Sequence, residues 1–366
     1  MEKVKFVNTL KTNFYNTLKK NVDKYFTENN ISKYANKQMI IKTIVMLCLY
    51  LLPYILIVSI RNINEILMIG LLIIMGIGLA GVGMNIMHDA NHGSYSKFSI
   101  INKILGYTMN LIGANAYTWK IKHNILHHTY TNIDNFDEDI DSYGILKLTP
   151  NQKSKKIFKF QYIYSFFLYG LVTLEWCISK DFLAFKRYLN KGLIEKKKIL
   201  PELTILVMSK IIYFFFLIAL PIMILNLPWW KVIIGFLILH FTAGIILATT
   251  FQLAHVVEKT IYPTTNENGN IENEWAIHQL LTTSNFATKN KFITWFLGGL
   301  NHQIEHHLFP HICHIHYSKI SEIVKNTCKQ FNLPYNYYET FSEALNSHIR
   351  LLKNFGNIPS NQVYSK

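Results

Sequence analysis

The chain is poor in cysteine and in acidic residues. Its four cysteines form no CxxC pair, which argues against an iron–sulfur cluster, a zinc ribbon or a disulfide framework. Only 22 acidic residues stand against 37 lysines and arginines, giving a formal charge of +15. Such a charge can indicate nucleic-acid binding, but here the basic residues border apolar runs and no nucleic-acid motif accompanies them. We therefore expect no nucleic-acid partner, and we expect anionic membrane lipids to face this charge.

Long apolar runs are abundant. A bilayer core needs about 20 residues of helix, and four runs reach this length: 41–60 and 67–87 as a first pair, 203–225 and 232–254 as a second. Trp229 and Trp230, between the second pair, are typical of a membrane–water interface. The sequence predicts an all-α, polytopic membrane protein with four transmembrane helices in two hairpins. Two weaker stretches, 100–116 and 160–178, are expected to lie against the bilayer as re-entrant or interfacial helices.

An even number of spans places the N-terminus, the central segment and the C-terminal region on one side of the membrane. Lysines mark that side: Lys3, Lys5, Lys11, Lys19, Lys20, Lys24, Lys33, Lys37, and the clusters at 153–156 and 196–198. The two opposite turns contain only Arg61 and Lys231. The positive-inside rule makes the lysine-rich side cytoplasmic. We expect a cytoplasmic N-terminal segment (1–40), a transmembrane domain (41–334) and a cytoplasmic C-terminal tail (335–366).

Eight of the fifteen histidines fall into three short clusters. HDANH contains His88 and His92, HNILHH contains His123, His127 and His128, and NHQIEHH contains His302, His306 and His307. Imidazole is the commonest metal ligand, and histidines four apart share one helical face. The predicted topology puts all three clusters on the cytoplasmic side, where a helical cap could hold them together. So many imidazoles exceed one ion's needs, and two iron ions would suit activation of O2 because iron, unlike zinc, changes oxidation state.

The remaining histidines and the acids favour plainer roles. We expect His302 to pack or support a ligand, His240 to make a hydrogen-bonded helix contact, and His311, His314 and His316 to be structural, because their spacing fits no ordinary zinc motif. The spacing of His278 and His348 indicates no particular role. The acidic stretch 134–141 fails the EF-hand pattern at its sixth and twelfth positions. One or two of its carboxylates, and Asp89 or Glu305, are expected to accept the free N–H of a metal-bound histidine.

HDANH, HNILHH and QIEHH around two pairs of spans resemble the integral-membrane fatty acid desaturase family over residues 41–334. Gln303 in the third box resembles the front-end subgroup, and similar bacterial proteins are described as acyl-CoA or acyl-lipid desaturases. The resemblance implies O2-dependent insertion of a cis double bond into a CoA- or lipid-linked acyl chain at a diiron centre. The ligands it implies are His88, His92, His123, His127, His128, His255, Gln303, His306 and His307. Phe251 stands where some members have asparagine, and Gln252 is the nearest polar residue.

The resemblance also implies an external source of electrons. The chain has no HPGG haem motif, so we expect a separate ferredoxin, or cytochrome b5 with its reductase. Two alternatives stay open. A related histidine-box hydroxylase would use the same ligands on a fatty acyl or alkane substrate and is distinguished by its product. A membrane metal-binding or transport protein would place ionisable ligands within its spans, where only His240 lies.

Overall fold

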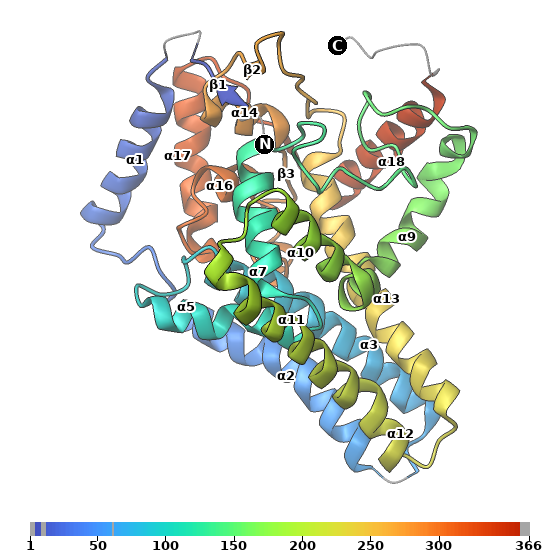
Figure 1. The fold of residues 1–366 in the computed structure, drawn as a ribbon. Coiled ribbons are helices and arrows are strands. Elements are labelled where there is room, and N and C mark those ends of the chain that lie inside the picture. Colours follow the sequence, from blue (N-terminus) through green and yellow to red (C-terminus); the bar gives the residue numbers. More distant parts are fainter. Residues whose placement is uncertain (1–3, 9–11, 61, 359–366) are drawn as a thin grey trace. The chain divides into compact units, whose positions relative to one another are not determined.

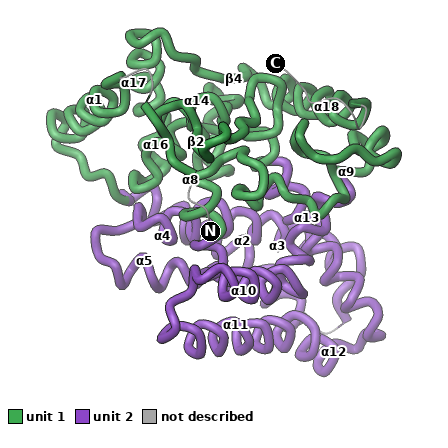
Figure 2. The backbone as a smooth tube through the Cα atoms, turned by 45° about the horizontal axis from the view of Figure 1, so that its top comes forward, with its two compact units in different colours: residues 1–34, 122–165, 250–366 green, residues 35–121, 166–249 purple. Residues whose placement is uncertain are grey.

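The computed structural model describes residues 4–8, 12–60 and 62–358, so Lys3, Lys11 and Arg61 lie outside the described residues. The described chain is predominantly helical, as predicted, and its strands are two residues long (Figure 1). By contacts it divides into two compact units, drawn in Figure 2. Unit 1 comprises residues 1–34, 122–165 and 250–366, and unit 2 comprises residues 35–121 and 166–249. Each unit is therefore assembled from segments that are far apart in the sequence.

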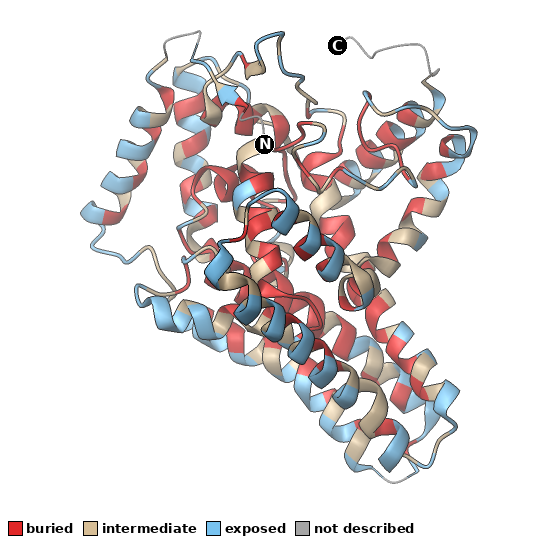
Figure 3. Cartoon of the chain, viewed as in Figure 1, coloured by how far each residue is buried: buried red, intermediate tan, exposed pale blue. Residues whose placement is uncertain are grey.

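Unit 2 contains most of the long apolar helices. Its elements are α2 (Lys37–Ser59), α3 (Glu65–Gly81), α4 (His88–Asn91), α5 (Ser99–Gly106), α6 (Thr108–Leu111), α7 (Ala116–Lys120), most of α9 (Gln161–Glu175), α10 (Asp181–Asn190), α11 (Ile199–Phe214), α12 (Leu220–Ile224) and most of α13 (Trp229–His255). The α2–α3 hairpin is tight because Asn64 caps α3 and Gly78 faces the α2 backbone; a Cβ at Gly78 would lie 2.4 Å from Tyr50 N. The outward faces of α2, α11 and α12 expose apolar side chains such as Ile41, Ile211 and Met223, as lipid contact requires (Figure 3).

Five helices among the described residues are long and apolar enough to cross a membrane. Four of them, 37–59, 65–91, 196–224 and 229–255, cover the four predicted spans. The fifth, 156–190, contains the stretch 160–178, which we expected to lie against the bilayer. The sequence therefore missed how far the helix continues beyond that stretch on both sides. The other weak stretch, 100–116, forms the short helices α5 and α6 and the start of α7.

Unit 1 is a helical body with two small parallel sheets. Its elements are β1 (Lys5–Phe6), α1 (Phe14–Glu28), α8 (His128–Tyr130), the end of α13, β2 (Asn270–Ile271), α14 (Trp275–Thr282), β3 (Asn285–Phe286), α15 (Lys291–Phe296), α16 (Gln303–Leu308), α17 (Tyr317–Gln330), β4 (Tyr337–Tyr338) and α18 (Phe341–Asn357). β1 pairs with β2 and β3 with β4. One apolar core joins α1, α14, α16 and α17 through Leu18, Leu280, Leu308 and Ile320. This core fixes α14 and α16 against each other.

Candidate metal centre

Two of the three histidine clusters meet in unit 1, together with the end of α13. His123 and His127 lie in a π-helical turn, Ile121–His127, and His128 begins α8. The π-helix is rare and occurs mostly as single turns, frequently at functional sites. His306 and His307 lie on α16 and His255 ends α13. All six imidazoles are buried, so unit 1 gathers them away from water.

His127, His255 and His307 form a compact triplet. Their ring centroids lie 4.7 Å apart for His127 and His255, and 4.9 Å apart for each of the other two pairs. Their ligand atoms lie within 4.8 Å of one another. This is the arrangement of three protein ligands on one face of a metal ion.

An acceptor holds the Nδ1 atom of each ring in this triplet. The Nδ1 of His127 lies 3.1 Å from both carboxylate oxygens of Asp137. His255 Nδ1 lies 3.3 Å from the Thr282 carbonyl oxygen, and His307 Nδ1 lies 2.8 Å from Gln279 Oε1. These oxygens can only accept, so each Nδ1 carries its hydrogen and each Nε2 keeps a lone pair. A metal-bound histidine takes this tautomer.

Two buried atoms that could bind metal have no hydrogen-bond partner, which supports a metal ion at this site. His255 Nε2 and Gln303 Oε1 make no hydrogen bond within the described part of the chain, although both are buried. A buried polar atom is normally hydrogen-bonded, and an unsatisfied one calls for an explanation such as a bound ion. Imidazole nitrogens with an amide oxygen are a donor set that suits iron.

The acidic loop supplies the partner of His127, as the sequence predicted. Asp137 is buried and also accepts the backbone N–H groups of Asn132 and Asp139 at 2.9 Å each. Burial lowers the pKa of His127, but the Asp137 carboxylate opposes it through charge and hydrogen bonding, and the pKa ends above its ordinary value. Asp139 contributes in the same direction and forms an ion pair with Lys122. The carboxylate therefore orients the ring and increases its basicity.

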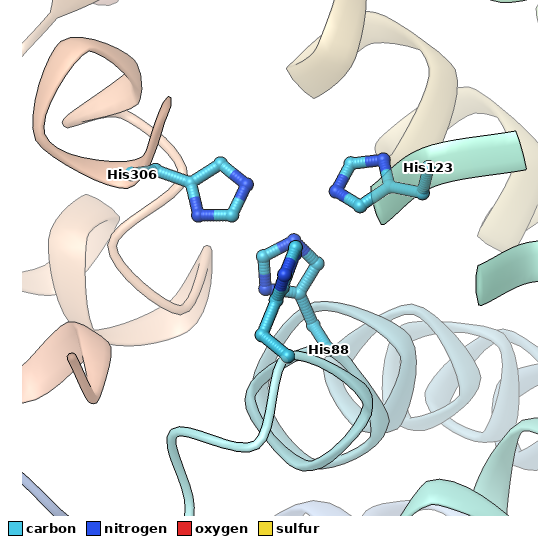
Figure 4. A group of neighbouring side chains, drawn as sticks. His88, His123 and His306 are labelled. Carbon is cyan, nitrogen blue, oxygen red and sulfur yellow. The ribbon is translucent and has the colours of Figure 1, made fainter. Parts of the chain in front are cut away.

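A second triplet is formed by His123, His128 and His306. The Nε2 atom of His128 lies 3.2 Å from that of His123 and 3.0 Å from that of His306. Two nitrogens at right angles on one ion, each roughly 2.1 Å from it, would be about 3 Å apart. The ring centroids of His123 and His306 are 5.7 Å apart, and both side chains are labelled in Figure 4. The spacing fits ligands of one metal.

The neighbours of this triplet set its orientation. Tyr317 Oη lies 3.3 Å from His306 Nδ1. The His128 carbonyl accepts hydrogen bonds from Trp275 Nε1 at 3.0 Å and from Gln279 Nε2 at 3.2 Å. Gln279 thus links the backbone of one triplet to His307 of the other, because its Oε1 faces His307 Nδ1.

The first cluster lies in unit 2. A π-helical turn, Val82–Met87, leads from α3 into α4, which carries His88 and is followed by His92. The two rings are 4.8 Å apart, and Trp119 lies against both, at 5.7 and 5.8 Å. His88 is also labelled in Figure 4, on its own helix. Asp89 Oδ1 lies 3.9 Å from His88 Nδ1, and its support of a metal-bound histidine stays a prediction.

Glu305 supports the third box in a way the sequence did not predict. It accepts hydrogen bonds from Asn285 Nδ2 at 2.7 Å and from Tyr335 Oη at 3.0 Å. Asn285 Oδ1 in turn accepts the N–H of Ile304 at 2.9 Å. Glu305 therefore fastens α16 to β3 and to the chain before β4, and its Oε2 also lies 3.7 Å from His302 Nδ1.

Several other histidines have the structural roles expected of them. His302 Nε2 lies 3.4 Å from Ser318 Oγ, and His240 contacts Tyr213 Oη at 2.9 Å and Thr173 Oγ1 at 3.1 Å. His316 Nε2 lies 3.4 Å from the Tyr34 carbonyl oxygen. The sequence missed Gln279, Thr282 and Tyr317, which hold metal-binding candidates; none stands within a motif that could have identified it.

Buried histidine clusters that could bind metal, and helices long and apolar enough to cross a bilayer, are together the features of a histidine-rich membrane protein. The sequence profile described as fatty acid desaturase matches residues 65–339, and the chain belongs to this family. It is accordingly an oxidoreductase, a fatty acid desaturase. The family is generally diiron-dependent, and the histidine clusters could bind such metals.

Similar proteins cover nearly the whole chain. The sn-1 linoleoyl-lipid 6-desaturase of Synechocystis sp. is 38% identical over 97% of this chain and 98% of its own. The protein of the same description from Arthrospira platensis is 36% identical over 93% and 92%. The acyl-lipid (8-3)-desaturase of Physcomitrium patens is 35% identical over 94% of this chain and 72% of its own. The resemblance inferred from the three boxes is thereby confirmed.

Proposed function

We propose that this desaturase is of the front-end type and inserts a cis double bond into a lipid-linked acyl chain, using O2. The relatives that cover nearly all of the chain are described as linoleoyl-lipid and acyl-lipid desaturases, which favours a glycerolipid over a CoA ester. The observation that carries the proposal is the triplet of His127, His255 and His307, with every Nδ1 hydrogen directed at an acceptor.

The metal centre we propose contains two iron ions. His127, His255 and His307 would hold one ion, and His123, His128 and His306 would contribute to the second. His88 and His92 are proposed as further iron ligands because of their place in the first histidine box. Gln303 is a weaker ligand, direct or through water. When bound, iron supplies the reduction of O2 that removes two hydrogens from the acyl chain. The protein orients the rings through Asp137, Gln279, Thr282 and Tyr317, and its buried setting excludes water from the reaction.

We further propose four spans in two hairpins, with the histidines on the cytoplasmic side. Helix 156–190 would then lie along the interface: it is the least apolar of the five candidates, and both its ends are charged. Reporter fusions after residues 30, 62, 150, 227 and 340 test this. Cytoplasmic signals at 30, 150 and 340, with opposite signals at 62 and 227, are expected. If the fusions after residues 150 and 340 reported opposite sides of the membrane, the four-span topology would be contradicted.

Electrons are proposed to come from a separate ferredoxin, or cytochrome b5 with its reductase. A hydroxylase would yield a hydroxy acid from the same centre, so product analysis separates the two reactions. The test expresses the chain, with a matching donor, in a host lacking polyunsaturated lipids, and analyses fatty acids by gas chromatography and mass spectrometry.

A new unsaturated acid in the lipid fraction is expected from the wild type and from His311→Ala, since His311 is exposed. His127→Ala and His307→Ala should yield none. Unchanged product from both of these variants would remove the metal assignment, and a hydroxylated product would favour the alternative reaction.

A further inference from the structure

A short helix in unit 1 presents large aromatic side chains to solvent. α15 (Lys291–Phe296) exposes 70% of Phe292 and 39% of Trp295. Phe292 also stacks on Phe296 with centroids 6.2 Å apart. Exposed aromatic surface is costly in water, because burial of a large apolar side chain is favourable. Grouped on one short helix, these rings indicate an interaction surface.

This helix lies close to the end of a membrane-spanning candidate. The N–H of Ser284 donates to the carbonyl of Ala254 at 2.9 Å, and Ala254 is the penultimate residue of α13. Lys291 follows Ser284 by only seven positions, a span of at most about 25 Å when fully extended. α15 therefore begins within this distance of the end of α13.

The charges around α15 match a lipid headgroup layer. Lys289 and Lys291 precede the aromatic residues, and both are exposed. Lys289, with 84% of its side chain exposed, also forms an exposed ion pair with Glu339 at 3.7 Å. Segments that lie in the headgroup region of anionic membranes typically combine tryptophan and phenylalanine with neighbouring lysines. Each lysine near such a surface adds to the electrostatic attraction.

Hydrogen bonds connect α15 to the third histidine box. Asn290 caps the helix by accepting the N–H of Ile293 at 3.0 Å. Asn301 Nδ2 donates to Thr294 Oγ1 at 2.9 Å, and the Asn301 carbonyl accepts the N–H of Phe286 at 3.0 Å. Asn301 stands two residues before Gln303, where α16 begins. A force that holds α15 in place is thus transmitted to α16.

We propose that α15 is an interfacial anchor: Phe292 and Trp295 insert into the headgroup–acyl boundary of an anionic bilayer, and Lys289 and Lys291 contact lipid phosphates. The anchor holds the third histidine box at a fixed height above the membrane, which a lipid-linked substrate embedded in that membrane requires. The anchor does not depend on which acyl chain or bond is used.

Depth measurement on the full-length protein tests the anchor. Phe292→Cys is labelled with a nitroxide in a Cys48→Ser background, since Cys48 is exposed and the other three cysteines are buried. Asn268→Cys, in the exposed polar turn 266–270, is the matched control. In liposomes containing phosphatidylglycerol, oxygen should relax the label at 292 more than a water-soluble nickel chelate does, and the order should reverse at 268. Trp295→Cys repeats the test should Phe292→Cys fail to fold.

Lipid charge separates the anchor from a protein-docking surface. Replacing phosphatidylglycerol by phosphatidylcholine, or introducing Lys289→Gln and Lys291→Gln together, should shift the label at 292 towards the water phase. A label that collides with the nickel chelate as freely as the control in every liposome overturns the proposal. So does a label that is shielded only after a soluble electron carrier is added, because α15 would then bind protein instead of lipid.

Discussion

Replacing Asp137 by asparagine removes the charge behind His127 and should weaken iron binding. Asp137 is buried, both its oxygens lie 3.1 Å from His127 Nδ1, and each also accepts a backbone N–H at 2.9 Å. Asparagine has one oxygen, so its amide N–H would face another donor. Asp139 lies 3.4 Å from the same Nδ1, but its pairing with Lys122 limits compensation. Loss of a carboxylate partner typically costs about 10- to 100-fold in metal affinity, or about 1.4–2.8 kcal/mol.

Competition with a ferrous chelator measures this loss. Purified wild type, Asp137→Asn and Asp141→Asn are equilibrated with graded chelator, and bound iron is determined by inductively coupled plasma mass spectrometry. Asp141 is exposed in the same loop and accepts the N–H of Tyr143, so its variant should bind like the wild type. The reasoning is refuted if Asp137→Asn also binds like the wild type while His127→Ala has lost iron.

Three further changes have defined outcomes in thermal unfolding of the solubilised protein. Gly78→Ala should destabilise it by about 1–3 kcal/mol, because the added methyl meets the α2 backbone. Gly70→Ala is the control, because the space around Gly70 is open. Equal melting temperatures for the two variants would contradict the packing. Lys210→Met leaves Asp181 buried without the ammonium group that lies 2.6 Å from it, and should lower the stability by about 3–5 kcal/mol. Adding Asp181→Leu to this variant should restore most of the lost stability. A double variant as unstable as Lys210→Met would argue against the ion pair. Burial lowers the pKa of His348 to about 4 from 6.5, so the unfolded chain takes up its proton first. This group alone should lower stability by about 2.5 kcal/mol between pH 6.5 and 4. His348→Asn should reduce the slope by that amount, and an unchanged slope would reject the assignment.

Periodicity and composition were enough to predict the apolar helices, because a run of about 20 apolar residues matches the length of a membrane-spanning helix. The fifth candidate was only partly recognised. Gly170 interrupts the apolar pattern of 160–178, but its Cβ position lies 2.3 Å from the Phe241 ring, so glycine here allows a close helix contact instead of ending the helix. A tertiary contact of this kind cannot be read from a local window.

The ligand candidates stood out in the sequence because clustered histidines are rare by chance, and their binding of iron stays a prediction. Their supports were predicted only where they are close in sequence: Asp137 follows His127 by ten residues, in a loop that already stood out by its charge. Gln279 is 28 residues from His307, and Thr282 holds His255 through its backbone carbonyl, which has no sequence signature. Glu305 lies 3.7 Å from His302, but its hydrogen bonds to Asn285 and Tyr335 were not predicted, since they depend on how β3 and the chain before β4 pack against α16.

The metal content of purified, active protein tests the central claim, that imidazoles from distant segments hold two irons. Elemental analysis should find two irons per chain, and X-ray absorption at the iron edge should show nitrogen and oxygen neighbours with the multiple scattering typical of imidazole. Active protein that contains no iron, or iron bound mainly by sulfur, would contradict it.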